Sequence, residues 1–474
     1  MEEELTPDLC VIGGGSGGLS VAAAAAQMGV PVVLIEKGLM GGDCLNYGCV
    51  PSKALLAAGK RADAVRTAST FGIDVLEAQI DHRAVHDHVH RVIANIAPND
   101  SVERFTGLGV RIIQAQASFL DKDTVEAGRV LVRARRFVIA TGSTPTVPAI
   151  PGLDEVPYLT NETIFDIGER IQHLIVLGGG PIGLELGQAH RMLGSQVTIF
   201  DTGEFLSRED PEAAKVLLKR LKDTDVTMYP NTRIERVEPS VQGLAVHFHQ
   251  GGDSVIVKGS HVLVATGRRP NLKSLSLDRA GITHTDRGIK VNDQLRTSNR
   301  KVYAVGDAIG GAQFTHLASY HASIVIKNAL LRLKPDVNAI HIPRVMYTDP
   351  ELAQIGLTET EAREKHRHIR IYRWPFADND RAQAERRTEG FIKAITKKDG
   401  TILGVTIVGA EAGELLQLWI VAMAKDMHIG DLTSLVLPYP TLSEISKRVA
   451  FTYYQPLLSK GWLRWLIGLL RKLG

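Results

Sequence analysis

Apolar residues along the chain gather in short runs that end at glycines or polar turns. Residues 8–37 predict a strand, a glycine-rich turn, an alanine-rich helix and a second strand, and residues 173–201 repeat this order. Further apolar runs within 135–145, 261–271 and 301–311 predict strands that end in Ala-Thr-Gly or Gly-Asp. Because strands alternate with helices, the pattern favours an α/β fold.

Both repeated segments contain the glycine pattern G-x-G-x-x-G and end in an acidic residue. Glu36 and Asp201 lie at the same distance after the third glycine of their segments. Glycines let the backbone approach a pyrophosphate, the helix N-terminus supplies N–H donors, and the acid binds a ribose diol. Two complete copies predict two dinucleotide sites, with the glycines Gly13, Gly15 and Gly18 in the first and Gly178, Gly180 and Gly183 in the second.

With 474 residues the chain is long enough for several domains, each with its own core. The order of the motifs predicts that the first nucleotide domain is interrupted by the second and then resumes. We expect a first nucleotide domain at 1–150 and 276–340, a second at 151–275, an α+β domain at 341–455, and an amphipathic cationic tail at 456–474.

Composition narrows the classes of function. The net charge of +3 is too small to predict a nucleic-acid partner, and no basic cluster with interleaved aromatic residues occurs. No apolar run reaches the roughly 18 residues of a membrane-spanning helix. The acidic first residues run directly into a strand without the pattern of a signal peptide, so we expect a cytoplasmic protein.

Two of the three cysteines, Cys44 and Cys49, lie close together in GGDCLNYGCVPSK. On a straight helix their Cα atoms would be roughly 8–9 Å apart, farther than the about 7 Å that a disulfide tolerates. Gly48 permits a bend, so the pair is either two unrelated thiols or a reducible disulfide. If a helix follows Cys49, then Lys53 lies on the same face and favours the thiolate. Cys10, within an apolar strand, is expected to be plain core.

The two glycine motifs, the C-x₄-C-V-P-S-K block and the third domain together resemble the flavin-dependent pyridine nucleotide–disulfide oxidoreductases, which include dihydrolipoamide dehydrogenase and mercuric reductase. The resemblance covers residues 8 to about 455. It implies two nested Rossmann-type domains, for FAD and NAD(P)H, plus a C-terminal α+β dimerisation domain and a homodimer. It also implies a redox-active disulfide, with Cys49 nearest the flavin and Cys44 facing the substrate.

The same resemblance implies roles for single residues. Lys53 would pair with Glu185 beside the flavin, and Gly306 and Asp307 would meet the ribityl and phosphate region. The implied cofactor-binding residues are Gly13, Gly15, Gly18, Glu36, Gly42, Thr141, Gly142, Gly306, Asp307, Leu317 and Ala318 for FAD, and Gly178, Gly180, Gly183, Asp201 and Gly267 for NAD.

The residues after the second nucleotide strand indicate which nicotinamide binds. An acid there binds a free 2′-hydroxyl but repels a 2′-phosphate, which prefers arginine. Asp201 is followed by another acid, Glu204, and the first arginine is Arg208. The sequence therefore predicts NADH rather than NADPH.

The segment LVLPYPTLSEISKR departs from the family pattern at one position. The resemblance implies His-Pro-Thr-x-x-Glu, whose histidine, oriented by the glutamate, serves the site of the other subunit. Here Pro440, Thr441 and Glu444 match, but Tyr439 replaces the histidine. A phenol of pKa about 10 is a poorer base near neutral pH than an imidazole near 6.5. Mercuric reductases resemble the chain at Pro438 and Tyr439, but they use a C-terminal cysteine pair that this sequence does not show.

A second segment has two interpretations. His82, His86 and His90 recur at helical spacing, which is typical of a metal-binding stripe or of a solvated helix face flanked by Arg83 and Arg91. We assign no metal site.

The cationic tail also has two interpretations. As a helix it suits lying on a membrane surface, although packing against its own dimer explains it equally well. One stripe would carry Lys460, Arg464, Gly468, Arg471 and Lys472, and the rest would carry Trp462, Trp465, Leu466, Leu469 and Leu470.

Taken together, we expect a homodimeric enzyme that passes electrons from NADH through FAD to Cys44–Cys49 and on to a dithiol/disulfide substrate. The alternative acceptor is a thiol-bound metal ion, as in a mercuric reductase. An alternative of another class is a membrane-surface electron-transfer partner that docks through residues 460–474.

Overall fold

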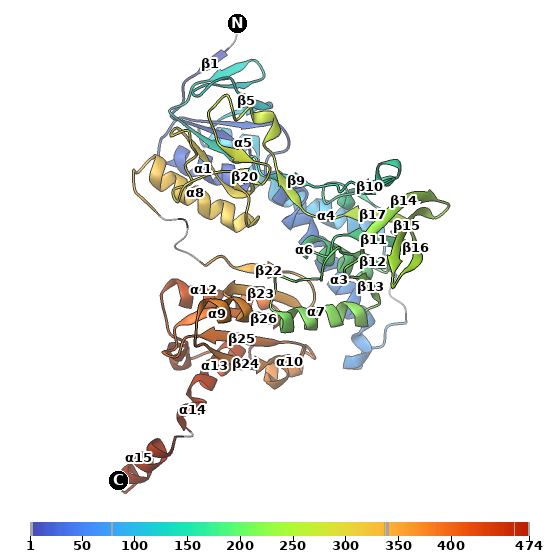
Figure 1. Ribbon diagram of the computed structural model, residues 1–474, viewed down its shortest axis with the longest axis vertical. Coiled ribbons are helices and arrows are strands. Elements are labelled where there is room, and N and C mark those ends of the chain that lie inside the picture. Colours follow the sequence, from blue (N-terminus) through green and yellow to red (C-terminus); the bar gives the residue numbers. More distant parts are fainter. Residues whose placement is uncertain (1–2, 77–78, 336, 338–340, 459, 473–474) are drawn as a thin grey trace. The chain divides into compact units, whose positions relative to one another are not determined.

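The chain forms two compact units, the first of residues 1–202 and 232–339 and the second of residues 203–231 and 340–474 (Figure 1). The computed structural model describes all residues except 1–2, 77–78, 336, 338–340, 459 and 473–474. The boundaries of the domains expected from the sequence stay a prediction.

The first glycine motif lies in a five-stranded parallel sheet with the order β21-β8-β2-β3-β4. Strand β2 is buried along its whole length, including Cys10, as expected for plain core. Because β8 precedes the second glycine motif and β21 follows it, their pairing confirms that the first nucleotide domain is interrupted and resumes. The strands are Leu9–Ile12 (β2), Val32–Glu36 (β3), Arg111–Gln114 (β4), Arg136–Ile139 (β8) and Val302–Ala304 (β21), and the helices α1 (Ser16–Gln27) and α8 (Thr315–Ala329) pack together.

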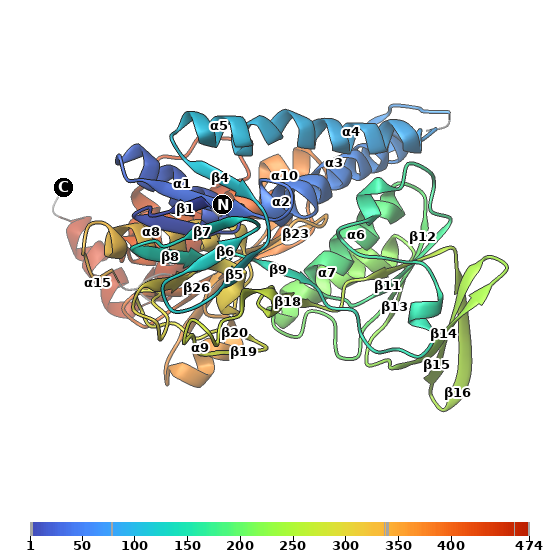
Figure 2. The same cartoon turned by 90° about the horizontal axis from the view of Figure 1, so that it is seen from above.

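The second glycine motif lies between two strands of another parallel sheet (Figure 2). Strand β11 pairs with β12 and β17, and β17 pairs with β10. Their bounds are Tyr158–Leu159 (β10), His173–Leu177 (β11), Gln196–Phe200 (β12) and His261–Val264 (β17), with helix α6 at Pro181–Met192. An antiparallel meander is formed by Ile234–Ser240 (β14), Gly243–Gln250 (β15) and Asp253–Gly259 (β16).

Shorter elements complete the first unit. One small sheet has the order β1-β7-β6-β5, with strands Glu3–Leu5, Val130–Val132, Val125–Ala127 and Ala117–Phe119. Two short antiparallel pairs are formed, one between the distant strands Ser143–Pro145 (β9) and Arg268–Pro270 (β18) and one in the hairpin of His284–Thr285 (β19) and Gly288–Ile289 (β20). The remaining α-helices are Gly42–Asn46 (α2), Cys49–Arg66 (α3), His82–Ile96 (α4) and Val102–Gly107 (α5).

The second unit is built on an antiparallel sheet with the order β22-β23-β26-β25-β24. Strands β25 and β26 are fully buried, and the indole of Trp419 lies in the core beside them. This sheet confirms the predicted α+β character. The strands are Arg344–Met346 (β22), Glu351–Gly356 (β23), Arg370–Pro375 (β24), Phe391–Thr396 (β25) and Ile402–Gly409 (β26). The other elements are Val226–Tyr229 (β13), Pro211–Asp223 (α7), Glu359–Lys365 (α9), Asp380–Ala384 (α10), Ala412–Leu415 (α11), Gln417–Ala424 (α12), Glu444–Phe451 (α13), Gln455–Leu458 (α14) and Gly461–Leu470 (α15).

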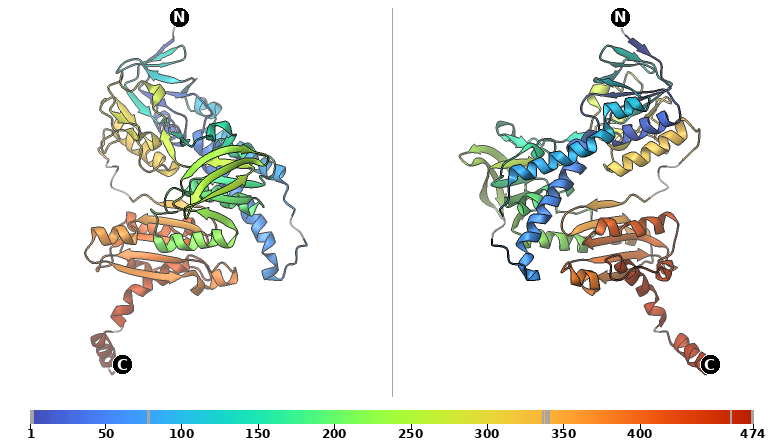
Figure 3. Two further views of the ribbon diagram at one scale, coloured as in Figure 1. Left: turned by 45° about the vertical axis from the view of Figure 1, so that its right-hand side comes forward. Right: turned by 180° about the vertical axis from the view of Figure 1, so that it is seen from behind.

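Helices α14 and α15 lie at the C-terminal end of this unit (Figure 3). None of the residues of α15 is buried. Trp462 and Trp465 are 56% and 68% exposed, so the apolar face expected from the sequence is open in this chain.

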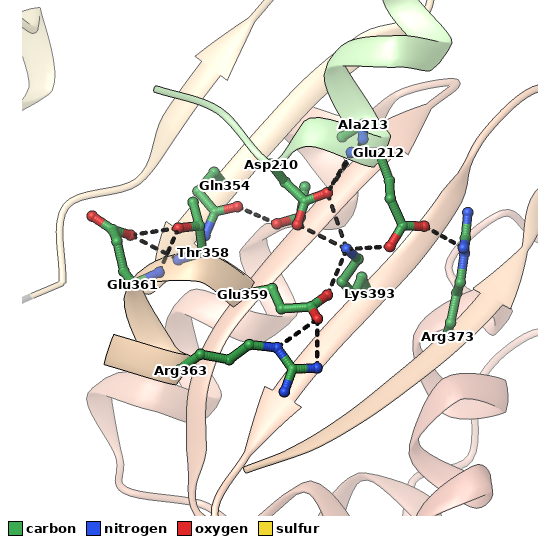
Figure 4. A network of polar contacts seen from close by, with 11 residues as sticks. Asp210, Glu212, Ala213, Gln354, Thr358, Glu359, Glu361, Arg363, Arg373 and Lys393 are labelled. Carbon is green, nitrogen blue, oxygen red and sulfur yellow. Dashed lines mark hydrogen bonds and ion pairs between the residues drawn. The ribbon is translucent and has the colours of Figure 1, made fainter. Parts of the chain in front are cut away.

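A buried charge cluster fastens the segment 203–231 inside the second unit (Figure 4). The Lys393 ammonium on β25 donates to Asp210 at 2.9 Å, to Glu212 at 2.8 Å and to Glu359 at 3.0 Å. Lys393 and Asp210 are almost fully buried, and the Asp210 carboxylate also accepts from the first backbone N–H groups of α7. Arg373 pairs with Glu212 and Arg363 pairs with Glu359, so three cations face three carboxylates. This balance matters because an unpaired buried charge is costly.

We expect Lys393→Met to destabilise the second unit by about 3–5 kcal/mol, the usual cost of removing one partner of a buried pair. All four tryptophans lie after residue 340, so tryptophan fluorescence during urea unfolding reports on this unit. The control is Lys393→Met combined with Asp210→Asn, which removes the stranded carboxylate but keeps a capping side chain and should regain part of the loss. A single variant as stable as the parent would contradict this account.

Candidate active site

The chain bends between the two neighbouring cysteines. Cys44 lies in α2, which ends at Asn46, and Cys49 is the first residue of α3. A Cβ at Gly48 would lie 2.8 Å from the Asp43 carboxylate and 3.0 Å from the Asp43 carbonyl oxygen, so the tight bend favours glycine there. The structure therefore has the bend that the sequence analysis required for a reducible pair, and both cysteines are free thiols in it.

The two thiols differ in proton affinity. A hydrogen bond from Cys44 lowers the pKa of Cys49 to about 6, with help from Thr315 and Lys53 and against the effect of burial. The same hydrogen bond, followed by burial, raises the pKa of the Cys44 thiol. The Cys49 sulfur also lies 3.3 Å from the Thr315 hydroxyl. The environment of the pair therefore favours the thiolate on Cys49 and the thiol on Cys44.

A cation lies one helical turn after Cys49. Lys53 donates from Nζ to Glu185 Oε2 at 2.7 Å, and Glu185 is buried in α6. The pair joins α3, the helix that begins at Cys49, to α6 of the second glycine motif, and these two helices pack together. The structure thus brings together the lysine and glutamate that the sequence analysis paired.

The first glycine motif forms a tight turn at the start of α1. Gly13 has a φ of 111°, and a Cβ on Gly42 would lie 2.7 Å from Gly15 Cα, so side chains cannot fit where the backbones meet. Glu36 accepts from Gly14 N at 2.5 Å, and no side chain caps α1. The open N–H groups and this close-packed glycine cradle fit the pyrophosphate of a dinucleotide.

The second glycine motif repeats this geometry. Gly178 has a φ of 110°, and α6 begins after Gly180 without a side-chain cap. Asp201 accepts from Gly179 N at 2.7 Å, as Glu36 does in the first motif. A Cβ on Gly183 would meet the Gly178 carbonyl at 2.0 Å. These residues fit a second dinucleotide.

The remaining predicted FAD residues gather near the start of α8. Asp307 accepts from the Ser143 hydroxyl at 2.6 Å, and burial raises the pKa of its carboxyl. Leu317 and Ala318 are buried in the first turn of α8. The Thr141 hydroxyl donates to the Asn271 carbonyl, and Gly142 has a positive φ in the turn after its strand. Gly267, which was predicted for the NAD site, has a positive φ in the corresponding turn.

Sequence reasoning missed Arg268, which connects several of these segments. Its guanidinium lies 2.9 Å from Asp43 and donates to the Ser143 carbonyl at 2.9 Å and to Asn161 at 3.2 Å. Asp43 is the residue before Cys44, so Arg268 links the cysteine segment to the turn at Gly267. Its position directly after the second Ala-Thr-Gly was the available signal.

Tyr439 and Glu444 lie in the second unit but share no hydrogen bond that the structure describes. The Tyr439 hydroxyl donates to Asp380 at 2.8 Å, and this bond raises the pKa of the phenol. Glu444 accepts from Arg448 at 2.8 Å and 3.1 Å. The partner of the tyrosine is therefore Asp380, a residue absent from the sequence-based site.

The histidine stripe lies on α4 within a packed interface. The rings of His86 and His90 are 4.2 Å apart, and His90 Nε2 lies 3.1 Å from the Phe165 carbonyl. Across the described parts of the chain, no three His, Cys, Asp or Glu side chains gather as a metal site. Likewise, no helix among the described residues is long and apolar enough to cross a membrane.

Comparisons with known proteins agree with this geometry. The family model of pyridine nucleotide–disulphide oxidoreductases matches residues 7–322, and the model of their dimerisation domain matches 342–450. A mercuric reductase of Lysinibacillus sphaericus is 34% identical over 94% of this chain and 82% of its own length. A dihydrolipoyl dehydrogenase of Geobacillus stearothermophilus is 34% identical over 93% of this chain and 94% of its own.

A solved structure has the same fold. The HOCl-induced flavoprotein disulfide reductase RclA of Escherichia coli matches 94% of this chain and 99% of its own with a TM-score of 0.85, at 26% identity. The predicted fold class and family are confirmed. The chain belongs to the pyridine nucleotide–disulfide oxidoreductase family, as a FAD-dependent enzyme that uses NAD(P)H, acts on sulfur groups and has a C-terminal dimerisation domain.

Proposed function

We propose that this enzyme carries electrons from NADH to a Cys44–Cys49 disulfide and on to a dithiol/disulfide substrate, in the manner of a dihydrolipoamide dehydrogenase. Bound FAD supplies the two-electron relay between the nicotinamide and the disulfide. The observation that carries the proposal is the unequal thiol pair beside the Lys53–Glu185 ion pair.

The chain's own residues keep the two sulfurs in different states. Two electrons and one proton convert the disulfide into one thiolate and one thiol. The pKa of about 6 assigns the thiolate to Cys49, where the Lys53 charge stabilises it. Once Cys44 has lost its proton, its sulfur attacks the substrate disulfide and releases a substrate thiol, and Cys49 then displaces the second thiol as the protein disulfide re-forms.

The proposed cofactor residues are those expected from the sequence. Their support is the glycine cradle at each motif and the acid that each cradle holds. For FAD we propose Gly13, Gly15, Gly18, Glu36, Gly42, Thr141, Gly142, Gly306, Asp307, Leu317 and Ala318, and for the nicotinamide nucleotide Gly178, Gly180, Gly183, Asp201 and Gly267.

The alternative acceptor is a thiol-bound metal ion, the substrate that the name mercuric reductase indicates for that relative. Tyr439 favours this alternative, because the raised pKa of its phenol makes it a weak replacement for a histidine base. Lipoamide and thiol-buffered Hg(II), each tested with NADH, separate the two acceptors.

We further propose a cytoplasmic enzyme whose tail contacts a membrane surface. No acidic residue follows Glu444, whereas four basic residues lie within 456–474. The tail helix α15 exposes Trp462 and Trp465, and a basic helix with exposed tryptophans suits an anionic lipid surface. This observation supports the second candidate role, electron transfer to a membrane partner.

Replacing Cys49 by serine should lower lipoamide-dependent NADH oxidation by at least about three orders of magnitude, the scale on which loss of a nucleophile acts. FAD content and NADH oxidation by ferricyanide should stay unchanged, because one-electron acceptors bypass the disulfide. Cys10→Ala, a change in a buried strand, is the matched control and should retain lipoamide turnover. Full lipoamide activity in the Cys49 variant would refute the proposed function.

The ratio of kcat/KM for NADH to that for NADPH should be at least about 10, because an acid at the ribose is worth about 1.4 kcal/mol or more against a 2′-phosphate. Asp201→Ala should reduce this ratio. Glu235→Gln, which alters an exposed acid of β14, is the control and should leave the ratio unchanged. A chain that prefers NADPH would contradict the assignment of Asp201.

Serine at both Trp462 and Trp465 should reduce co-sedimentation with vesicles of phosphatidylcholine and 30% phosphatidylserine by about tenfold or more, since each indole supplies much of the buried apolar area. Pure phosphatidylcholine vesicles provide the charge control, and lipoamide turnover should not change. Unchanged co-sedimentation of the double variant would contradict membrane contact. If gel filtration then showed a changed dimer size, the two tryptophans would instead be assigned to the dimer.

A further inference from the structure

The chemistry of the cysteine pair leaves one requirement unmet within the proposed site. The pKa of the Cys44 thiol is raised, so its sulfur must give up a proton before it can attack a substrate. Tyr439 occupies the position where the family resemblance implied a histidine base. The hydrogen-bond partner of the Tyr439 hydroxyl therefore determines how this residue can accept or donate a proton.

The Tyr439 hydroxyl donates its hydrogen bond to Asp380. The two oxygens are 2.8 Å apart, and Asp380 is the first residue of α10. Tyr439 is 67% exposed, so the phenol oxygen remains accessible while its own proton points to the carboxylate. A hydroxyl in this state offers lone pairs and no free proton.

The backbone around the pair is fastened, so the contact does not depend on two loose surface side chains. Asn379 is 4% exposed, and its amide donates to the Thr441 carbonyl at 3.1 Å while its oxygen caps α10. The Thr441 hydroxyl in turn donates to the Pro438 carbonyl at 2.8 Å. The start of α10 and the loop of Tyr439 therefore form one hydrogen-bonded unit.

Glu444, the acid that the sequence assigned to orienting residue 439, is bonded elsewhere. Arg448, one helical turn later on α13, donates to the Glu444 carboxylate through two nitrogens. The acid that contacts the Tyr439 hydroxyl comes from a segment about 60 residues earlier.

We propose that Asp380 is a positioning residue for Tyr439 and the transient acceptor of the proton that the phenol passes on. This proposal rests on the proposed function, in which residue 439 serves the thiol chemistry of a disulfide site. As a thiol proton moves to the phenol oxygen, the phenol proton moves to the carboxylate. Thiol and carboxylate become thiolate and carboxylic acid only during the attack. The proton then returns through the phenol to the departing substrate sulfur, so neither the oxidation state nor the total number of protons changes.

The test measures kcat/KM for lipoamide between pH 6 and 10 in Asp380→Asn, Tyr439→Phe and the double variant. Asp380→Asn should lower kcat/KM for lipoamide about tenfold, which is less than the loss usually seen when a general base itself is removed. If the two residues act together, the double variant should be no slower than Tyr439→Phe. NADH oxidation by ferricyanide should not change.

Two controls isolate the role of Asp380. Asp378→Asn removes an exposed acid two residues away and should behave like the parent, whereas Asp380→Glu should restore part of the activity. With ¹³C-labelled tyrosine, the Tyr439 signal should titrate at lower pH in Asp380→Asn, because the carboxylate raises the pKa of the phenol in the parent. This titration needs no turnover.

Parental kinetics in Asp380→Asn, or strictly multiplicative effects in the double variant, would overturn the proposal. So would a Tyr439 titration unaffected by Asp380→Asn. Retained lipoamide turnover in the Cys49 variant would instead overturn the proposed function, so the two failures are distinguishable.

Discussion

Two neighbouring thiols that cannot ionise together impose the central constraint of this enzyme. One hydrogen bond between Cys44 and Cys49 lowers the pKa of the second and raises that of the first. The surrounding structure reinforces this difference. The bend at Gly48 starts a helix at Cys49, and Lys53 lies one turn further on. The interaction that favours the thiolate of Cys49 therefore also makes the thiol of Cys44 harder to deprotonate.

A lysine paired with a buried carboxylate occurs in each unit, with different consequences. Lys53 contacts one buried carboxylate, Glu185, and is still about one-third exposed, so its charge can act on the nearby sulfur. Lys393 is fully enclosed and meets three carboxylates, which consume its hydrogen-bonding capacity. The first arrangement leaves a charge available for chemistry, whereas the second only joins α7 to the sheet. The exposure of each ammonium thus separates a lysine that can act on a neighbouring group from one that only joins elements.

Local patterns account for the parts of the structure that the sequence predicted. The glycine motifs and their acids are encoded within about 30 residues, because strand, turn and helix must follow one another for a dinucleotide to bind. The bend between the cysteines was also accessible, since spacing and one glycine determine it. The pairing of β8 with β21 followed from the order of the motifs.

Contacts between distant segments were not predictable in this way. Asp380 reaches Tyr439 and Arg268 reaches Asp43 only because separate elements meet in the folded chain. No spacing rule signals such pairs in a single sequence. The expected link from Glu444 to residue 439 illustrates the difficulty, because an arginine one turn away on the same helix binds that carboxylate. Local ion pairs at helical spacing compete directly with distant functional ones.

The choice of acceptor follows from the proton requirement of Cys44. A histidine would take the thiol proton at neutral pH and return it to the leaving thiol. The hydrogen bond to a carboxylate raises the pKa of Tyr439, so the phenol stays protonated at neutral pH and takes up a thiol proton less well than a histidine. The same raised pKa makes the phenol a weaker acid, so it also returns a proton to the leaving thiol less well. Thiol–disulfide exchange depends least on proton return when the leaving thiol is acidic, because a low-pKa thiolate departs readily. A metal ion that is reduced while it is bound to thiolates takes up electrons but no proton. Under the proposed function we therefore expect a site with Tyr439 and Asp380 to favour disulfides with acidic leaving thiols, or a thiol-bound metal ion as the alternative acceptor.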